Sequence, residues 1–548
     1  MVNHPARTQW HMSMVDSGET CFVIGTEEAL PGVVSAVDQI KGPAIDPKPR
    51  TIKASAQDKP ICVFGFILCI AALFINSARS EYEEKYRPQY HFSPKRGWIG
   101  DPDGLIFFKN EYHLFWWGHA VSKDLVHWKE MPYPMQGGRG DFQYFTGSVV
   151  VDKNNTAGFG KDSLVAIYTM HDSATSKEAQ GISYSEDGIK FQFYNQNPVL
   201  DLHNDDFRDP HVFWFEPSKY WVMAITKPKE HKVGFYASNN LKKWNHLSDF
   251  GPDGDVSQVW EVPDLFELPL NGNSNTKKWV LTVGVGPNRV QYFVGKFNGR
   301  EFIKEKAEKS TLWADYGADF YAARTWRNYD QPRDSRIVWM GWMGNWKYAN
   351  AVPTGWGRGF ESVPRQLSLK AFPYGIRLVQ TPVEEIRSLR GTKTTITDQK
   401  YNIFRKAGEF TPKRNVYEIL MTLHLDDAKI AGINLLEGGG RKLQVGYNAE
   451  TGMLFIDRSN CSDHFSDQKF NGSFPERMRA PLRLKSGQIK LNILIDESSV
   501  EVFANDGEVT LSATTFPDPK QTGISFFAKG GATIKKFEAW ELTSIWNR

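Results

Sequence analysis

The sequence predicts an all-β protein. Between about Tyr90 and Leu378, apolar and polar residues alternate in short runs that have the length of single strands. Glycine, asparagine, aspartate and proline separate these runs where turns are expected. Long segments with a helical period are absent from the sequence. A sandwich, a barrel or a propeller of strands is compatible with this pattern.

The bulk composition sets limits on domains and partners. The chain has 548 residues, too many for one ordinary hydrophobic core, so we expect two or more domains. The formal net charge is +3 and no long run of Lys and Arg occurs, which argues against nucleic acid as a partner. The 18 Trp, 20 Tyr and 36 Phe suit either β-structure or flat surfaces for sugar rings.

The N-terminal segments resemble a leader. Residues 1–60 combine no sustained apolar period with many Pro, Gly and Ala, and we interpret them as disordered. The segment 61–78 begins with an uncharged run from Ile61 to Ile75, which is shorter than a bilayer span and fits the core of a signal peptide. Basic residues upstream favour export of the C-terminal part. Two outcomes fit this segment: secretion, or a single-pass membrane anchor through 61–78 with the C-terminal part outside. A start codon assigned too far upstream is a third explanation for the position of the apolar run.

The cysteines and sequons are compatible with export. Cys461 is the only one of the four cysteines that lies beyond the apolar segment, so a disulfide framework cannot form there. Three Asn-X-Ser/Thr sequons, which suit a secreted glycoprotein, begin at Asn154, Asn460 and Asn471.

We expect a short linker helix over 379–391 between two β domains. Its expected features are a capping box from Thr381 to Glu384, Pro382 at the first helical position, an apolar stripe at Ile386 and Leu389, and a stop at Gly391.

Strands resume after the linker. Leu491–Ile495 and Ser499–Phe503 are separated by a turn-like triplet, and Asn505-Asp506-Gly507 is typical of a tight hairpin turn. We therefore expect a β-sandwich over 392–548 and a separate β domain over 85–378.

Three acidic motifs lie within the first β region. They are Trp98-Ile99-Gly100-Asp101-Pro102-Asp103-Gly104, Phe207-Arg208-Asp209-Pro210 and Trp260-Glu261-Val262-Pro263-Asp264-Leu265-Phe266. Taken singly, each has an ordinary structural explanation, because Asp-Pro-x-Gly is a common turn sequence.

Taken together, the three motifs indicate a glycosidase. Hydrolysis of a glycosidic bond needs two carboxylates across the scissile bond, one ionised and one that holds a proton. A third polar cluster has to hold the sugar hydroxyls in place. Strands arranged around one axis can bring carboxylates from distant parts of a chain together.

The order of these motifs resembles glycoside hydrolase family 32, which contains invertases, inulinases and levanases. The resemblance runs from about residue 88 to the C-terminus. It also includes Trp117-Gly118-His119-Ala120-Val121-Ser122-Lys123-Asp124-Leu125-Val126-His127-Trp128, Phe145-Thr146-Gly147-Ser148, Asp319-Phe320-Tyr321-Ala322-Ala323, Gly341-Trp342-Met343-Gly344-Asn345-Trp346, Pro364-Arg365-Gln366-Leu367-Ser368-Leu369 and Ser499-Val500-Glu501-Val502-Phe503.

The resemblance implies a five-bladed β-propeller followed by a C-terminal β-sandwich. It implies a hydrolase that releases fructose from sucrose, inulin or levan by a retaining double displacement. Asp101 would be the nucleophile, and Glu261 the general acid and then the general base. Asp209, with Arg208 beside it, would bind fructose hydroxyls and stabilise the reacting sugar. Residues implied to contact the sugar are Trp98, Trp117, Phe145, Thr146, Asp319, Tyr321 and Trp346.

The chain departs from the usual family pattern at several positions. Gly100 and Asp103 stand where Asn is common, Val262 replaces a common Cys, and Thr146 replaces a common Ser. The segment between Phe115 and Trp117 is short and lacks the usual Gln-containing loop. In the family, the usual residues at these positions help to hold the substrate, so the departures bear on substrate preference.

Two other functions fit the same residues. A fructosyltransferase would use the same covalent intermediate with a sugar acceptor, and a catalytically silent carbohydrate-binding propeller would keep only the fold. A pentosidase on a related propeller ranks third. We expect no metal or organic cofactor, because His119 and His127 lie eight residues apart without a third ligand. The choice among sucrose, inulin and levan, exo or endo attack, and the oligomeric state stay open.

Overall fold

The computed structural model describes residues 81–548, except for 136–141, 306–309, 328–335, 402–403, 407–409, 463–464, 466, 475–476 and 547–548. The expected leader over 1–60 and the apolar segment 61–78 lie outside the described residues. Among the residues that are described, no helix has the length and apolar character needed to cross a membrane.

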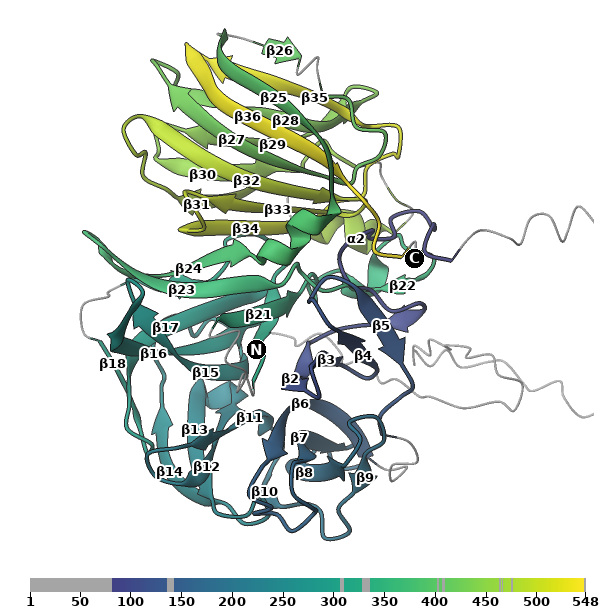
Figure 1. Cartoon of the computed structure of the whole chain (residues 1–548), viewed down its shortest axis with the longest axis vertical. Coiled ribbons are helices and arrows are strands. Elements are labelled where there is room, and N and C mark those ends of the chain that lie inside the picture. The colour runs from purple at the N-terminus through teal and green to yellow at the C-terminus, as the bar shows by residue number, and fades with distance from the viewer. Residues whose placement is uncertain are drawn as a thin grey trace, which may run out of the picture. The chain divides into compact units, whose positions relative to one another are not determined.

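The N-terminal domain is a five-bladed β-propeller, whose sheets follow one another around a common axis (Figure 1). The first blade contains β2 (Asp103–Phe108), β3 (Glu111–Phe115), β4 (His119–Ser122) and β5 (Trp128–Met131). The second contains β6 (Phe142–Asp152), β7 (Ser163–Asp172), β8 (Glu178–Ser185), β9 (Gln192–Phe193) and β10 (Leu200–Asn204). The third contains β11 (Arg208–Phe215), β12 (Tyr220–Lys227), β13 (Lys232–Ser238) and β14 (Asn245–Phe250), with the 3₁₀ helix η1 (Pro228–Glu230) after β12.

The last two blades share one sheet. The fourth contains β15 (Trp260–Leu270), β16 (Asn273–Val285), β17 (Arg289–Phe297), β18 (Phe302–Lys304) and β19 (Leu312–Trp313). The fifth contains β20 (Tyr321–Thr325), β21 (Ile337–Trp342), β23 (Arg365–Phe372) and β24 (Gly375–Pro382), with the 3₁₀ helix η2 (Ala349–Ala351) after β21. A parallel contact between Leu270 and Leu369 joins the two blades.

The ring of blades is not closed by a shared strand in the described part of the chain. The first and last blades meet instead at a parallel bridge between Ile106 and Arg327. Two short strands, β1 (Gly97–Trp98) and β22 (Gly357–Arg358), pair in parallel beside it. This pairing holds the chain immediately before Asp101 against the segment that follows the fifth blade's second strand.

Local turn chemistry explains the hairpins within the blades. The turn between β2 and β3 consists of Lys109 and Asn110, with φ angles of 49° and 64°, between the paired residues Phe108 and Glu111. Two consecutive positive φ angles define the two-residue turn whose twist matches that of antiparallel strands. Asn tolerates this conformation better than most residues.

The C-terminal domain is a β-sandwich of two six-stranded sheets (Figure 1). One sheet contains β25 (Arg390–Tyr401), β36 (Ala532–Leu542), β27 (Tyr417–Leu425), β32 (Gln488–Asp496), β33 (Ser499–Ala504) and β34 (Val509–Thr514). The other contains β26 (Phe404–Lys406), β35 (Gly523–Lys529), β28 (Ile430–Gly438), β29 (Arg441–Asn448), β30 (Met453–Asp457) and β31 (Arg477–Pro481). A short helix, α2 (Gln468–Ser473), lies between β30 and β31. Ile419, Leu435, Val502 and Phe526 belong to the buried core of this domain.

Both hairpins expected from the C-terminal sequence are present. Glu497 and Ser498 form the turn between β32 and β33, whose ends pair at Asp496 and Ser499. The next turn follows Ala504 and contains Asn505-Asp506-Gly507, whose three φ angles are positive.

The linker differs from the expected helix. A 3₁₀ helix, η3, spans Glu384–Leu389, and Ile386 and Leu389 are buried as expected. The predicted capping box was wrong. Thr381 and Pro382 belong to β24 and pair with Gln366 and Arg365, and the cap residue Val383 makes no side-chain cap bond within the described residues. Pairing with β23 keeps the chain extended through Pro382, so tertiary pairing overrides the local helix signal.

Buried charges join the propeller to the sandwich. Arg365 of β23 donates hydrogen bonds to Asp315 at 3.0 Å and to Glu501 of β33 at 3.2 Å. All three side chains are at most 1% exposed. Asp315 also accepts a bond from the backbone N–H of Ser512 in β34 at 2.8 Å. The two domains therefore share a dry, hydrogen-bonded ion-pair network.

Removal of the cation from this network should be strongly destabilising. Arg365→Met would leave the carboxylates of Asp315 and Glu501 buried without their guanidinium, which costs about 3–5 kcal/mol in comparable buried pairs. The measurement is the urea midpoint of unfolding for the variant. Arg387→Met is the control, because the Arg387 side chain is 62% exposed. Equal midpoints for both variants would contradict a stabilising role for the Arg365 network.

Candidate active site

The first strand of every blade is irregular near its start. Register shifts interrupt β2 at 103–106, β6 at 145–147, β11 at 208–211, β15 at 261–264 and β20 at 321–324. Such bulges end regular pairing and re-aim side chains. Most residues predicted for the site lie at these irregularities or shortly before them. The exceptions are Trp98 in β1, Trp117 between β3 and β4, and Trp346 after β21. One structural device, repeated in five blades, therefore positions the predicted polar side chains.

Three of these irregular positions carry backbone strain. Asp209, Val262 and Ala322 are non-glycine residues with φ angles of 66°, 48° and 53°. Each such conformation costs roughly 1–3 kcal/mol and persists where the surroundings enforce it, most often at functional sites. The strain thus supports a functional role for this region.

Asp101 lies in a bend directly before β2. Its Oδ2 accepts a hydrogen bond from the Thr146 hydroxyl at 2.9 Å. Its Oδ1 is buried and has no hydrogen-bond partner among the described residues. Burial, and then the charge of Glu261, raises the pKa of Asp101 to about 6, although the Thr146 hydrogen bond opposes this rise. The carboxyl therefore has one anchored oxygen and one oxygen with a free lone pair.

Glu261, in β15, is held by two side chains. Arg208 donates to its Oε1 from Nη2 at 2.9 Å and from Nε at 3.1 Å. The hydroxyl of Tyr321 donates to its Oε2 at 2.6 Å. The Glu261 side chain is 22% exposed, so it faces solvent on one side while both oxygens are oriented.

The guanidinium of Arg208 is itself fixed by two carboxylates. Its Nη1 donates to Asp206 at 2.7 Å and to Glu178 at 3.1 Å. Glu178 also accepts the backbone N–H of Phe207 at 2.8 Å. This bracing turns the other edge of Arg208 toward Glu261 and shares its positive charge among three carboxylates.

Asp209 is buried beside both carboxyls. Its Oδ2 accepts a bond from the backbone N–H of Val262 at 2.9 Å, and Arg324 donates to its carbonyl oxygen at 3.2 Å. Burial raises the pKa of Asp209, while the adjacent guanidinium of Arg208 opposes this rise. The Asp209 carboxyl is therefore fixed to the same bulge that carries Glu261.

Aromatic rings form one side of the site. Trp98 stacks on Trp346 with ring centroids 5.6 Å apart and planes inclined by 21°. Trp342, which is fully buried, packs behind both at 5.9 Å from Trp98 and 4.9 Å from Trp346. Trp346 is 43% exposed, so its surface is available beside the carboxyls.

A second aromatic group lies on β6 and the β3–β4 connection. The indole N–H of Trp117 donates to the carbonyl of Tyr144 at 2.9 Å, yet the residue is 55% exposed. The adjacent Phe145 stacks on His171 at 4.8 Å. Because Thr146 follows directly and binds Asp101, this strand connects both rings to the nucleophile candidate.

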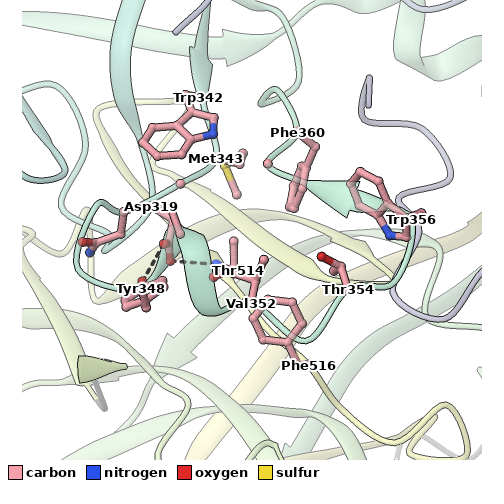
Figure 2. Close-up of a pocket in the computed structure, with 14 residues that line it drawn as sticks. Asp319, Trp342, Met343, Tyr348, Val352, Thr354, Trp356, Phe360, Thr514 and Phe516 are labelled. Carbon is pink, nitrogen blue, oxygen red and sulfur yellow. Dashed lines mark hydrogen bonds between the residues drawn. The ribbon is translucent and has the colours of Figure 1, made fainter. Parts of the chain in front are cut away.

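Asp319 is the exception among the predicted contacts. Its carboxylate is fully buried and accepts bonds from Tyr348 and from the backbone N–H of Thr514 at 2.9 Å (Figure 2). It also accepts a bond from Arg458 at 2.9 Å. Thr514 ends a strand of the sandwich, so Asp319 joins the two domains. We correct its assignment from sugar contact to interface residue, because no part of its carboxylate is left to face a sugar.

Sequence reasoning missed four charged residues of this region. They are Glu178, Asp206, Arg324 and Glu361. None forms a motif in the sequence. Only the position of Asp206, two residues before Arg208, was a signal, and an Asp near a turn is too common to identify a brace.

His119, one of the two histidines weighed for metal binding, packs against other rings. The ring of His119 is buried and stacks on Phe115 at 4.2 Å, with its Nε2 3.0 Å from His113 Nδ1. Over the described ranges, no cluster of three His, Cys, Asp or Glu side chains is arranged to hold a metal ion.

Comparison with known families identifies this arrangement. The family model described as "Glycosyl hydrolases family 32 N-terminal domain" matches residues 91–382. The model described as "Glycosyl hydrolases family 32 C terminal" matches residues 385–541. The chain belongs to glycosyl hydrolases family 32. It is therefore a glycosidase.

Relatives within family 32 support the same assignment. The chain is 41% identical over 520 residues to a levanase of Bacillus subtilis, covering 88% of this chain and 74% of the levanase. It is 34% identical to an extracellular exo-inulinase of Aspergillus ficuum, covering 85% and 96%. The crystal structure of the Aspergillus awamori exo-inulinase superposes with a TM-score of 0.77 at 32% identity, covering 85% of this chain and all of that one.

Proposed function

We propose that this family 32 glycosidase releases fructose from β-fructosides by double displacement, with Asp101 as nucleophile and Glu261 as general acid and base. The observation that supports these roles is the contrast between the two carboxyls. Asp101 has one oxygen that no described residue hydrogen-bonds, whereas both oxygens of Glu261 are oriented by Arg208 and Tyr321. A nucleophile needs a free lone pair, and an acid/base needs a fixed direction.

In the first step, Oδ1 of Asp101 attacks the anomeric carbon of a terminal fructosyl unit. The bond from that carbon to the bridging oxygen breaks, and Glu261 gives its proton to the departing oxygen. The product of this step is a fructosyl ester of Asp101. Thr146 stays on Oδ2 and holds the carboxyl plane while the ester forms.

In the second step, Glu261 acts as a base. It takes a proton from a water molecule, whose oxygen attacks the anomeric carbon and displaces the Asp101 carboxylate. Two inversions give net retention. We assign the binding of sugar hydroxyls to Asp209, which the backbone N–H of Val262 fixes, and packing against the sugar ring to Trp98 and Trp346.

The substrate and its location are inferred from the relatives. Relatives described as a levanase and an extracellular exo-inulinase favour fructans outside the cell. Sucrose, inulin and levan are therefore the substrates to test. Fructose as the main product, with β-fructose appearing first by NMR, would support retaining hydrolysis. Fructosyl oligosaccharides as the main product at high sucrose would favour a fructosyltransferase, and no product from any of the three would favour a silent binding protein.

The pH profile should report the nucleophile. Because Asp101 has to be ionised and its pKa is raised to about 6, kcat/KM should fall about tenfold per pH unit below this value. Thr146→Val removes a hydrogen bond to the ionised form, so the acid limb should move to higher pH. The measurement is kcat/KM from pH 4 to 8 for both proteins. An unmoved acid limb in the variant would contradict the role of Thr146.

A further inference from the structure

A buried acidic side chain outside the proposed mechanism lies close to the nucleophile. Glu361, between β22 and β23, is fully buried. Both of its carboxyl oxygens are buried and have no hydrogen-bond partner among the residues described. A carboxylate in this state would carry a large desolvation cost, so the group is expected to hold a proton.

The backbone fixes the direction of the Glu361 side chain. Glu361 and Trp342 are partners in an isolated antiparallel bridge, and directly opposed residues project from the same face. The Trp342 ring packs on Trp98 and Trp346 of the candidate site. Glu361 therefore projects toward the wall of the sugar site.

The chain around Glu361 has little freedom. Its backbone N–H donates to the carbonyl of Phe92 at 2.9 Å, and Ser362 donates to Gly341 at 2.8 Å. A Cβ on Gly359 would lie 2.1 Å from the carbonyl oxygen of Ile99. The segment thus packs against the residues that lead into Asp101.

Two carboxyls of the candidate site act on the charge state of Glu361. Burial raises the pKa of Glu361 well above its usual range, and the negative charges of Asp101 and Asp103 raise it further. The nearby histidine, His91, packs on Phe360 but gives its ring nitrogens to Asp496 and Glu501.

Asp101, by contrast, has favourable partners. Thr146 donates a hydrogen bond to it, and the guanidiniums of Arg324 and Arg208 lower its pKa against the effect of burial. When carboxyls share a buried site, the one with donors and cations ionises and the others keep their protons.

We propose that Glu361 is a positioning residue of the reaction, an un-ionised carboxylic acid that keeps the negative charge on this side of the site on Asp101. The proposal rests on the nucleophile role of Asp101. A neutral acid places a polar group in the buried surroundings of the Asp101 carboxylate without a hydrogen bond to it. It also adds no second charge to oppose the first.

The protonation of Glu361 can be measured without activity. A carboxyl that is neutral in the folded chain and ionised in the unfolded chain destabilises the fold as pH rises above its ordinary value. Glu361→Gln removes this linkage but keeps the shape. The unfolding constant of the wild type relative to the variant should increase about tenfold per pH unit between pH 5 and 7. Glu216→Gln is the control, because the Glu216 side chain is 69% exposed, and its ratio to the wild type should stay constant.

The effect on the nucleophile needs a second pair of variants. Glu361→Met removes every polar atom, so the acid limb of kcat/KM should move up by about one pH unit, or about tenfold lower kcat/KM at pH 5. Glu361→Gln keeps a neutral polar group of the same shape and should retain the wild-type acid limb. If Glu361 had only a structural role, the Met and Gln variants would not differ in the position of the acid limb.

Each arm has an outcome that overturns the proposal. A pH-independent ratio for Glu361→Gln would show that Glu361 is ionised in the folded chain. Equal acid limbs for the Met and Gln variants would show that it does not act on Asp101. Failure of the proposed function is distinguishable, because it would appear as an active Asp101→Asn variant while the stability ratio still changed with pH.

Discussion

Asp101→Asn is expected to reduce kcat on β-fructosides by a factor on the order of 10⁶, the scale of loss when the nucleophile of a covalent mechanism is removed. The amide has no ionised oxygen to attack the anomeric carbon. It can still accept the hydrogen bond that Thr146 makes to Oδ2 at 2.9 Å. The fold should therefore persist, and the loss should be chemical.

The measurement is initial-rate fructose release, with thermal unfolding to confirm the fold. Asp506→Asn is the matched control, since this aspartate is 61% exposed in a hairpin of the sandwich. Full activity is expected for the control. Substantial turnover by a folded Asp101→Asn protein would move the nucleophile role to another carboxyl, with Asp209 the first candidate.

Glu261→Ala is expected to lower turnover by roughly 100- to 10,000-fold on natural sugars. Without Glu261 the departing sugar oxygen receives no proton, and water is not activated in the second step. Asp101 can still attack. A fructoside with an activated leaving group needs little protonation, so its first step should partly survive.

Added azide should then rescue the second step. Azide needs no deprotonation, so it can displace Asp101 from the fructosyl ester without a base. Two inversions give a β-fructosyl azide, detectable by NMR and mass spectrometry. Asp101→Ala should not form this β product. If an Asp209 variant formed the azide and the Glu261 variant did not, the acid/base role would belong to Asp209.

The local pattern of the sequence was sufficient for the fold class and for individual turns. Alternation of apolar and polar residues predicts strands because each strand buries one face. The turn at Asn505-Asp506-Gly507 was predictable because these residue types adopt positive φ angles readily, and all three do. Such signals depend on neighbours along the chain.

Local signals failed where strand pairing or contacts with other parts of the chain compete with them. The Thr381–Glu384 pattern is a sound helix start by itself, but β24 pairs with β23 through Pro382 and keeps the chain extended. Asp319 belongs to a motif that resembles a sugar site, yet Arg458 and Thr514 of the sandwich occupy its carboxylate. Both partners of Asp319 are more than a hundred residues away in the sequence. A local residue pattern cannot predict contacts at that separation.

The sequence by itself determined the strand content, the family resemblance and the identity of the carboxyls proposed for catalysis. Only the tertiary structure decided what each carboxyl experiences. Asp101 and Glu361 are both buried acids, but Asp101 has Thr146 beside it and Glu361 has no hydrogen-bond partner within the described residues. Charge, desolvation and hydrogen bonding act through space, so the proposed difference between an ionised nucleophile and a protonated neighbour arises only when the blades bring these residues together.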